Sequence, residues 1–199
     1  MQSLKIPIIE TERLLLISMS VEFLRTMIAK DYEAAEEIGR FSVPRDYSLP
    51  TSRAESRLKM IEKDPEQHPW MYRSIVRKQD KRMIGNISFH HKAPDPDLLE
   101  HADLAVELGY TIEPVYRRKG YAKESAFAMM EWAHREQEIL TFLLTIRPDN
   151  VPSLRMAESM NFSKIGEKLD PIDGQEYLMR AEIDQILTAK NAYQAVRLS

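Results

Sequence analysis

Three basic residues stand directly before a glycine in the segment VYRRKGYA, residues 115–122. The segment lies between a predicted strand and a predicted helix, and the free N–H groups and dipole of a helix N-terminus attract anions. Gly120 lets the backbone approach a phosphate closely, and Ala122 keeps the first helical turn free of bulk. A pyrophosphate therefore suits this place, although a solvated basic turn has the same composition.

Other phosphate-binding and nucleophile patterns are absent from the sequence. It contains no GxxxxGK followed by Ser or Thr, no GxGxxG after a strand and no GxSxG turn. The chain also has no cysteine, which excludes disulfides, thiolate metal ligands and a cysteine nucleophile. We therefore expect chemistry by direct transfer, without a covalent intermediate on the protein.

Histidines and aspartates gather between residues 90 and 103. His90, His91 and His101 lie near Asp95, Asp97 and Asp103 in this stretch. Adjacent residues on a strand point to opposite faces, so His90 and His91 do not join one ligand set there. We expect no metal site and read PDPD as a solvated loop.

Length, composition and charge are typical of one soluble globular domain covering residues 1–199. The 199 residues carry a formal net charge of -3, with 43% hydrophobic and 30% charged residues. A general nucleic-acid binder usually has a basic surface, so the acidic balance argues against that class. We find no secretory signal and no run near the ~20 apolar residues of a membrane span. The expectation is a cytoplasmic protein, monomer or homodimer, without nucleic-acid or membrane partners.

Apolar periodicity predicts an α/β (α+β) protein with a central mixed, mostly antiparallel sheet flanked by helices. The predicted strands are Leu14–Met19, Met71–Val76, Met83–Phe89, Leu104–Ile112, Leu140–Ile146, Phe162–Lys168 and Glu176–Arg180. The predicted helices are Val21–Lys30, Thr51–Lys63, Gly120–Arg135, Ser153–Met160 and a C-terminal extension over 183–196. Ser52 and Glu55 have the spacing of a capping box. The strand–helix–strand unit from 104 to 146 should pair in parallel with a right-handed crossover.

The basic segment resembles the coenzyme A loop of GNAT acetyltransferases, whose pattern is Arg/Gln-x-x-Gly-x-Gly/Ala. Arg117, Gly120 and Ala122 stand in the matching places, and ELGYTIEPVYRRKGYAKES is similar to the branch that acetylates ribosomal-protein N-termini. RPDNVPSLRMAESMNF resembles the family's Asn-x-x-Ser/Ala helix, and IETERLLL resembles the first strand of that branch. The matches keep the family's order and cover the chain to about residue 180. The resemblance implies a GNAT fold with splayed strands and acetyl-CoA as cosubstrate.

The resemblance also implies contacts with coenzyme A at three places. The strand before the loop pairs with the pantetheine arm, the loop binds the pyrophosphate largely through backbone N–H groups, and the later helix contacts pantetheine or nucleotide. The matching residues are Tyr110, Thr111 and Ile112 in the strand, Arg117, Arg118, Lys119, Gly120, Tyr121 and Ala122 in the loop, and Asn150 and Ser153 in the helix. Asn150 has a second reading as a helix cap.

Glu107 is the candidate general base that the resemblance indicates. An amine with a pKa of about 10, as in lysine, arrives protonated and must lose a proton before it attacks a thioester. A carboxylate can take that proton directly or through one water. Strand alternation puts Glu107 on the face opposite Val106 and Leu108. The alternative reading is an ordinary solvent-facing strand glutamate.

Two positions depart from the family pattern. Many members carry a tyrosine that protonates the departing thiolate, but here that position is Ala157. The usual glycine before the conserved aromatic is Asn161, which tolerates the left-handed conformation. The missing tyrosine keeps open a non-catalytic acyl-CoA sensor, and another acyl donor is a further alternative.

We expect the acceptor to be a protein N-terminus or a small-molecule amine. The rims of its site are expected at Phe41–Asp46 and Asp170–Gln175. Asp170 and Asp173 would suit a cationic acceptor, although acidic turns are common.

Overall fold

The fold is described by a computed structural model of the chain. The described residues are 6–47, 49–98, 100, 102, 104–171 and 173–198. The chain divides into a first unit, Met1–Lys92 with Tyr110–Ala128, and a second unit, Ala93–Gly109 with Met129–Ser199. Strand β5 (Ala105–Ile112) and helix α4 (Tyr121–Gln137) contribute residues to both units.

The strands follow the mixed arrangement that the sequence predicts. In chain order they are β1 (Ile9–Glu10), β2 (Leu14–Ser18), β3 (Arg73–Arg77), β4 (Arg82–Phe89), β5, β6 (Thr141–Ile146), β7 (Ser163–Asp170) and β8 (Gly174–Glu182). The sheet order is β1-β2-β3-β4-β5-β6-β8-β7. The β5–β6 pair is parallel, whereas β1–β2, β2–β3, β3–β4, β6–β8 and β7–β8 are antiparallel. The predicted parallel unit and the mostly antiparallel sheet are thus confirmed.

The helices flank these strands. In chain order they are α1 (Val21–Ala29), α2 (Tyr32–Gly39), α3 (Thr51–Lys63), α4, α5 (Val151–Glu158) and α6 (Ile183–Leu198), with 3-10 turns η1 (Pro65–Trp70), η2 (Pro96–Leu98) and η3 (Pro114–Tyr116). Helix α6 confirms a helix at the predicted C-terminal extension, 183–196. Among the described residues, no helix has the length and apolar character needed to cross a membrane.

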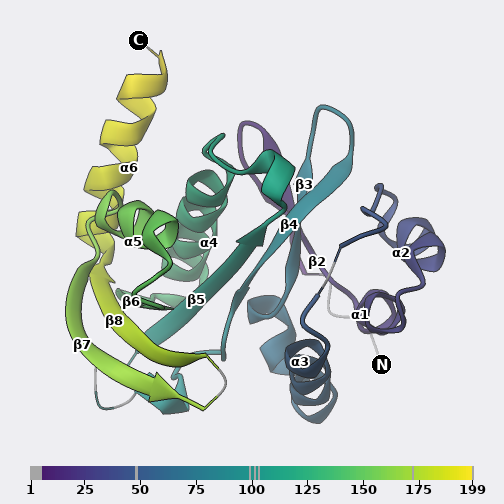
Figure 1. Cartoon of the computed structure of the whole chain (residues 1–199), viewed down its shortest axis with the longest axis horizontal. Helices are drawn as coiled ribbons and strands as arrows, with labels where there is room; N and C mark the ends of the chain where they lie inside the picture. Colours follow the sequence, from purple (N-terminus) through teal and green to yellow (C-terminus); the bar gives the residue numbers. More distant parts are fainter. Residues whose placement is uncertain are drawn as a thin grey trace. The chain divides into compact units, whose positions relative to one another are not determined.

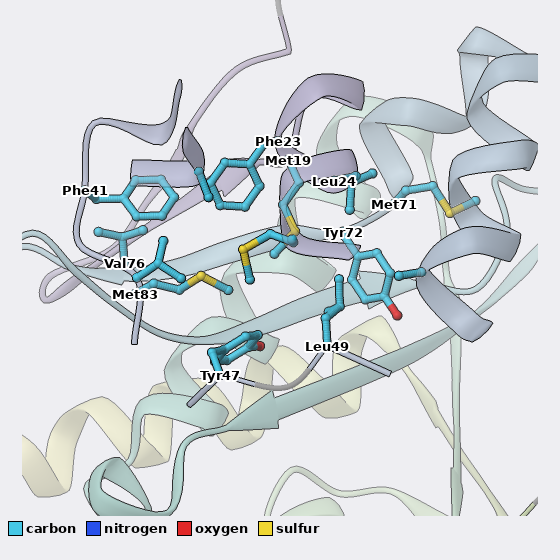
Figure 2. Close-up of a cluster of buried hydrophobic side chains, with 14 of the residues drawn as sticks. Met19, Phe23, Leu24, Phe41, Tyr47, Leu49, Met71, Tyr72, Val76 and Met83 are labelled. Carbon is cyan, nitrogen blue, oxygen red and sulfur yellow. The ribbon is translucent and has the colours of Figure 1, made fainter. Parts of the chain in front are cut away.

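The core of the first unit joins α1 to the sheet and to the segment after α2. Figure 2 shows Phe23 of α1 beside Phe41, and their ring centroids are 5.5 Å apart. Met83 of β4 and Tyr47 of the loop before α3 belong to the same buried cluster. Burial of one such aromatic side chain is worth about 2–3 kcal/mol, so this cluster fixes α1 on the sheet.

The second unit contains the parallel pair and a long hairpin. Figure 1 shows β7 and β8 as a curved antiparallel ribbon, drawn in green to yellow. Strand β8 also pairs with β6, whereas β7 is the last strand in the order. A small apolar cluster of Leu98, Ala105, Leu143 and Leu178 packs on one face of these strands.

Two local predictions differ from the structure. Helix α2 was not predicted, because its eight residues, YEAAEEIG, bury only Ala35 fully and show little apolar periodicity. The sequence feature that could have indicated this helix is Asp31, whose side chain caps the helix N-terminus by accepting from Ala34 N. The capping box at α3 is wrong, since Pro50 is the N-cap residue and makes no side-chain cap hydrogen bond. Ser52 already lies inside the helix.

Close packing of β4 against β5 in the first unit gives a testable prediction. A Cβ built on Gly85 of β4 would lie 2.1 Å from the backbone oxygen of Thr111 in β5. Backbone cannot yield as a flexible side chain can, so Gly85→Ala should lower the free energy of unfolding by about 2–3 kcal/mol. Urea denaturation measures this loss.

The matched control is Gly166→Ala in β7, because nothing lies within 4 Å of a Cβ at that position. This variant should be neutral or stabilised by about 0.5 kcal/mol through reduced unfolded-chain entropy. Equal stability of the two variants would contradict the close approach of β4 and β5.

Candidate active site

The segment that enters α4 presents unpaired backbone donors. Residues Arg118 and Gly120 have positive φ angles of 60° and 78°, and such turns bring successive N–H groups to one side of the chain. The first hydrogen bond into the helix is Glu124 N to Gly120 O, 3.0 Å. In the part of the chain that the structure describes, no protein group accepts from the N–H groups of residues 118–122. The loop thus has the donors that an anion requires.

A buried ion pair holds this loop in place. Glu124, in the first turn of α4, is only 8% exposed. Its Oε1 accepts from Thr11 Oγ1 at 2.6 Å and from Arg13 N at 2.9 Å, and its Oε2 accepts from Arg13 Nε at 2.7 Å. Arg13 also donates through Nη1 to the backbone oxygen of Lys119, 3.0 Å, and its guanidinium lies 4.5 Å from the Tyr121 ring centroid. One side chain therefore contacts both the loop and the helix start.

The environment of Glu124 favours its ionised form. Burial raises the pKa of the Glu124 carboxyl, but the hydrogen bonds from Thr11 and Arg13 outweigh burial and hold the pKa below its ordinary value. The sequence predicted neither Arg13 nor Glu124 as a functional residue. Their available signal was the acidic residue in the first turn of a helix, a place where carboxylates are favoured.

The basic side chains of the loop partly serve its own structure. Arg117 Nε donates to the backbone oxygen of Ile112 at 2.8 Å, and Lys119 Nζ donates to the backbone oxygen of Val115 at 3.1 Å. Both side chains are exposed, as is Arg118. The loop therefore combines fixed backbone donors with three cations near the protein surface.

Strand β5 loses its parallel neighbour before it reaches the loop. Within the described residues 104–171, the β5–β6 ladder pairs Ala105 with Thr141, Val106 with Phe142 and Glu107 with Leu143. Both strands then continue beyond the ladder, β5 to Ile112 and β6 to Ile146.

The candidate pantetheine-binding residues lie on this continuation of β5. Tyr110 is half-buried, Thr111 is exposed and Ile112 is buried. On the β4 side of β5, the residue after the strand, Glu113, donates its N–H to Ile84 O at 2.9 Å. The backbone of residues 110–112 therefore follows the splayed course that the resemblance implies, without a ladder to β6.

Glu107 is buried rather than solvent-facing. It is 3% exposed, so the ordinary surface reading of this residue is wrong. Thr145 of β6 donates its hydroxyl to Glu107 Oε1, and Lys168 Nζ of β7 lies 3.5 Å from Oε2. Register explains these contacts: Glu107 pairs with Leu143, and Thr145 follows Leu143 on the same face of β6. The carboxylate is thus held by a hydroxyl and faces one ammonium group.

The later pair of candidate residues lies at the start of α5. Asn150 is the N-cap of this helix, and its Oδ1 accepts from Ser153 N at 3.3 Å. The capping reading of Asn150 is therefore confirmed, and its contact with coenzyme A stays a prediction. Asn150 is exposed and Ser153 is half-buried.

Both departures from the family pattern have structural consequences. Ala157 is completely buried. Its methyl side chain has no proton to donate to a thiolate. Asn161 has a φ of 64°, and its Nδ2 donates to the backbone oxygen of Gln185 at 2.9 Å. The predicted left-handed conformation of Asn161 is confirmed.

The two adjacent histidines of the candidate metal cluster do not lie on a strand. Strand β4 ends at Phe89, so His90 and His91 lie beyond it and strand alternation does not separate them. Asp95 Oδ1 accepts from Asp97 N at 3.0 Å and stabilises the local turn. His101 and Asp103 lie outside the described residues, as does Ile172 in the predicted acceptor rim 170–175. The absence of a metal site stays a prediction.

Comparisons with known proteins agree with this geometry. Residues 13–163 match the family described as "Acetyltransferase (GNAT) domain". The curated protein "Uncharacterized N-acetyltransferase YnaD" of Bacillus subtilis is 28% identical over 92 residues, which are 46% of this chain and 49% of that protein. The chain thus spans about half the length of the curated relatives it matches.

Solved structures share the fold over most of the chain. The ribosomal-protein-S5-alanine acetyltransferase of Vibrio fischeri superposes with a TM-score of 0.62 at 17% identity, covering 89% of this chain and 97% of its own. A RimL ribosomal L7/L12 alpha-N-protein acetyltransferase in complex with coenzyme A superposes with a TM-score of 0.59 at 16% identity, covering 90% and 99%. At these identities the likeness shows the fold alone.

The Glu124 ion pair leads to a stability prediction. Glu124→Gln leaves Arg13 partly buried without its counter-charge, so the free energy of unfolding should fall by about 3 kcal/mol at pH 7. The carboxyl has a lowered pKa in the folded state, so its contribution is present above the unfolded value of about 4.3. The contribution disappears as pH falls through the folded value. Denaturation curves from pH 7 to pH 3 should therefore converge for the two proteins.

The control is Glu62→Gln, which breaks the exposed Arg25–Glu62 pair of 2.7 Å. Such surface pairs contribute about 0–1 kcal/mol. A Glu124→Gln variant no less stable than Glu62→Gln would show that the Arg13 contact does not hold the loop.

Proposed function

Because the chain belongs to the GNAT acetyltransferase family, we propose that it transfers an acetyl group from acetyl-CoA to a primary amine by direct attack in a ternary complex. The supporting observation is the loop before α4, whose N–H groups over residues 118–122 are unpaired among the described residues. These donors suit the pyrophosphate of coenzyme A, and Gly120 keeps the approach free of a side chain.

The coenzyme would contact residues from three elements. The backbone of Tyr110, Thr111 and Ile112 pairs with the pantetheine arm, because this part of β5 has left its ladder with β6. Arg117, Arg118, Lys119, Gly120, Tyr121 and Ala122 hold the pyrophosphate, and Asn150 and Ser153 contact the pantetheine or nucleotide. The capping bond of Asn150 uses Oδ1 and leaves its amide nitrogen as a donor for this contact.

Glu107 acts as the general base in this proposal. Its carboxylate accepts a proton from the protonated acceptor amine and leaves a free lone pair on nitrogen. The nitrogen then forms a bond to the acetyl carbonyl carbon, the carbon–sulfur bond breaks, and the nitrogen releases its second proton to solvent to give the neutral amide. The departing thiolate takes its proton from solvent, since Ala157 replaces the usual tyrosine. Thr145 holds the base in position through its hydroxyl.

The acceptor is proposed to be a protein N-terminus or a small-molecule amine. The similarity to ribosomal-protein acetyltransferases in fold and in the sequence around residues 107–125 supports this choice. We propose that residues 1–199 work as one acetyltransferase domain, since the family match at 13–163 runs through both units. We also propose that it works in the cytoplasm as a monomer or homodimer, without metal, nucleic acid or membrane.

A non-catalytic acyl-CoA sensor is the alternative function. The buried Ala157 favours it, because no proton donor stands at that position. Coenzyme release with a panel of amines separates the two: an enzyme releases free thiol in proportion to acetylated amine, and a sensor binds the coenzyme without release.

Coenzyme binding should stabilise the folded chain. Acetyl-CoA at about 100 times its dissociation constant adds roughly 2.7 kcal/mol, which thermal unfolding detects. Gly120→Asp should abolish the gain, because it places a side chain and a negative charge against the pyrophosphate.

Gly174→Asp is the matched control for this experiment. Gly174 has a φ of 79°, close to the 78° of Gly120, and nothing lies within 4 Å of a Cβ there. Both variants carry the same backbone strain, but Gly174→Asp should keep the coenzyme-dependent shift. A wild-type chain that shows no shift with saturating coenzyme would refute the proposed site.

The role of Glu107 is tested by Glu107→Gln. Glutamine keeps the shape and the acceptor for Thr145 but lacks the basic carboxylate, so kcat should fall about 10²–10⁴-fold. Coenzyme affinity measured by calorimetry should stay unchanged, and the acidic limb of the pH–rate profile should flatten. High pH should partly rescue the variant by supplying free amine.

Glu182→Gln provides the control in the same unit. Glu182 Oε2 also accepts from a threonine hydroxyl, Thr141 Oγ1, at 2.8 Å. That variant should retain wild-type rates. A Glu107→Gln enzyme within about threefold of wild type at every pH would remove Glu107 as the base.

A further inference from the structure

A second buried carboxylate lies on the same sheet face as Glu107. Thr145, which donates to Glu107, pairs with Leu178 of β8, and Glu176, two residues before Leu178, lies on the same face. Glu176 in turn pairs with Lys168 of β7. Register alone therefore gathers Glu107, Glu176 and Lys168 on one face of the second unit.

Glu176 is buried, and its carboxylate has no hydrogen-bond partner among the described residues. It is 8% exposed, and none of the residues that the structure describes donates a hydrogen bond to its carboxylate. Burial raises the pKa of the Glu176 carboxyl, Lys168 opposes this effect, and the charges of Asp173, Glu107 and Asp170 add to it. A buried carboxylate without donors is unfavourable unless a cation reaches it.

Lys168 supplies only part of the positive charge that this face requires. Its ammonium lies 3.5 Å from Glu107 Oε2, and the side chain is 40% exposed at the end of a flexible stem. Arg147, which also interacts electrostatically with Glu176, is paired with Asp149 at 2.5 Å. Carboxylates therefore outnumber cations around Glu176, which leaves room for one more ammonium group.

We propose that Glu176 is the residue that binds the acceptor amine in its cationic form, beside Glu107, with Lys168 standing in for that ammonium when no acceptor is bound. The proposal rests on the proposed function, since Glu107 is the base that then takes the proton. It specifies the acceptor class: aliphatic primary amines, which are ammonium ions at neutral pH, are bound, and neutral arylamines or alcohols are not.

The division of work between the two carboxylates follows from their contacts. Glu107 is oriented by Thr145, as a base requires, whereas no residue in the described part of the chain donates to Glu176, which acts as a counter-charge. Loss of Glu176 should therefore raise the KM for the amine, and loss of Glu107 should lower kcat.

The test is a chemical-shift titration of the full chain, saturated with coenzyme A, with n-butylamine hydrochloride and with n-butanol as the uncharged isostere. Wild type should bind the ammonium and discriminate against the alcohol. Glu176→Gln should weaken ammonium binding about 10–100-fold, the usual loss for a hydrogen bond to a charged group, and should leave alcohol binding unchanged. In turnover, the same variant should raise the KM for aliphatic amines with kcat within about threefold.

Two further variants sharpen the result. Glu167→Gln, on the exposed β7 position paired with Lys164 and Gln175, should behave as wild type. Lys168→Met removes the internal ammonium and should tighten n-butylammonium binding at least threefold; weaker binding would overturn the role given to Lys168. Ammonium binding by Glu176→Gln within twofold of wild type would overturn the role of Glu176.

Failure of the proposed function has a different signature. If coenzyme A does not bind, the proposed function fails, but the ammonium titration into the chain alone still tests Glu176. If coenzyme A binds and acetyl transfer occurs while Glu176→Gln leaves the ammonium affinity and the KM unchanged, only the assignment of Glu176 fails.

Discussion

The contact between Arg13 and Glu124 is the interaction on which the loop before α4 depends. A helix N-terminus attracts an anion only if its N–H groups are held in one direction, and a glycine-containing loop does not hold itself. Arg13 donates to both Glu124 and the backbone of Lys119, so the turn between β1 and β2 fixes the helix start and the loop together. The positive N-terminal end of the helix dipole also stabilises the Glu124 carboxylate in the first turn.

A carboxylate in the helix turn next to the proposed pyrophosphate site would repel the ligand unless a cation neutralises its charge. Glu124 satisfies this condition because its charge is compensated by Arg13 and its oxygens already accept hydrogen bonds. The exposed basic side chains of the loop are then left to act on a ligand. These contacts join the turn before β2 to the loop before α4, although the two segments lie more than a hundred positions apart in the chain.

In the second unit, by contrast, buried negative charge is only partly compensated. Glu107 and Glu176 are buried on one sheet face, and the half-exposed Lys168 of the neighbouring strand β7 lies on the same face. Such an arrangement is unfavourable in an isolated protein and becomes favourable when a cation arrives. In the proposed reaction, Glu176 binds the ammonium group of the acceptor and Glu107 takes its proton. The negative charge on this face would then serve both binding and deprotonation.

The sequence was enough to predict the strands from β2 to β8 in their order, the parallel crossover and the family. Each of these depends on local periodicity or on short motifs, such as the one from Arg117 to Ala122. It missed α2, which buries little, and placed a capping box where Pro50 begins the helix. The burial of Glu107, the contact of Arg13 with Glu124 and the pairing of Glu176 with Lys168 are seen only in the folded chain. These facts depend on strand register and on contacts between distant segments, and neither is encoded in the spacing of neighbouring residues.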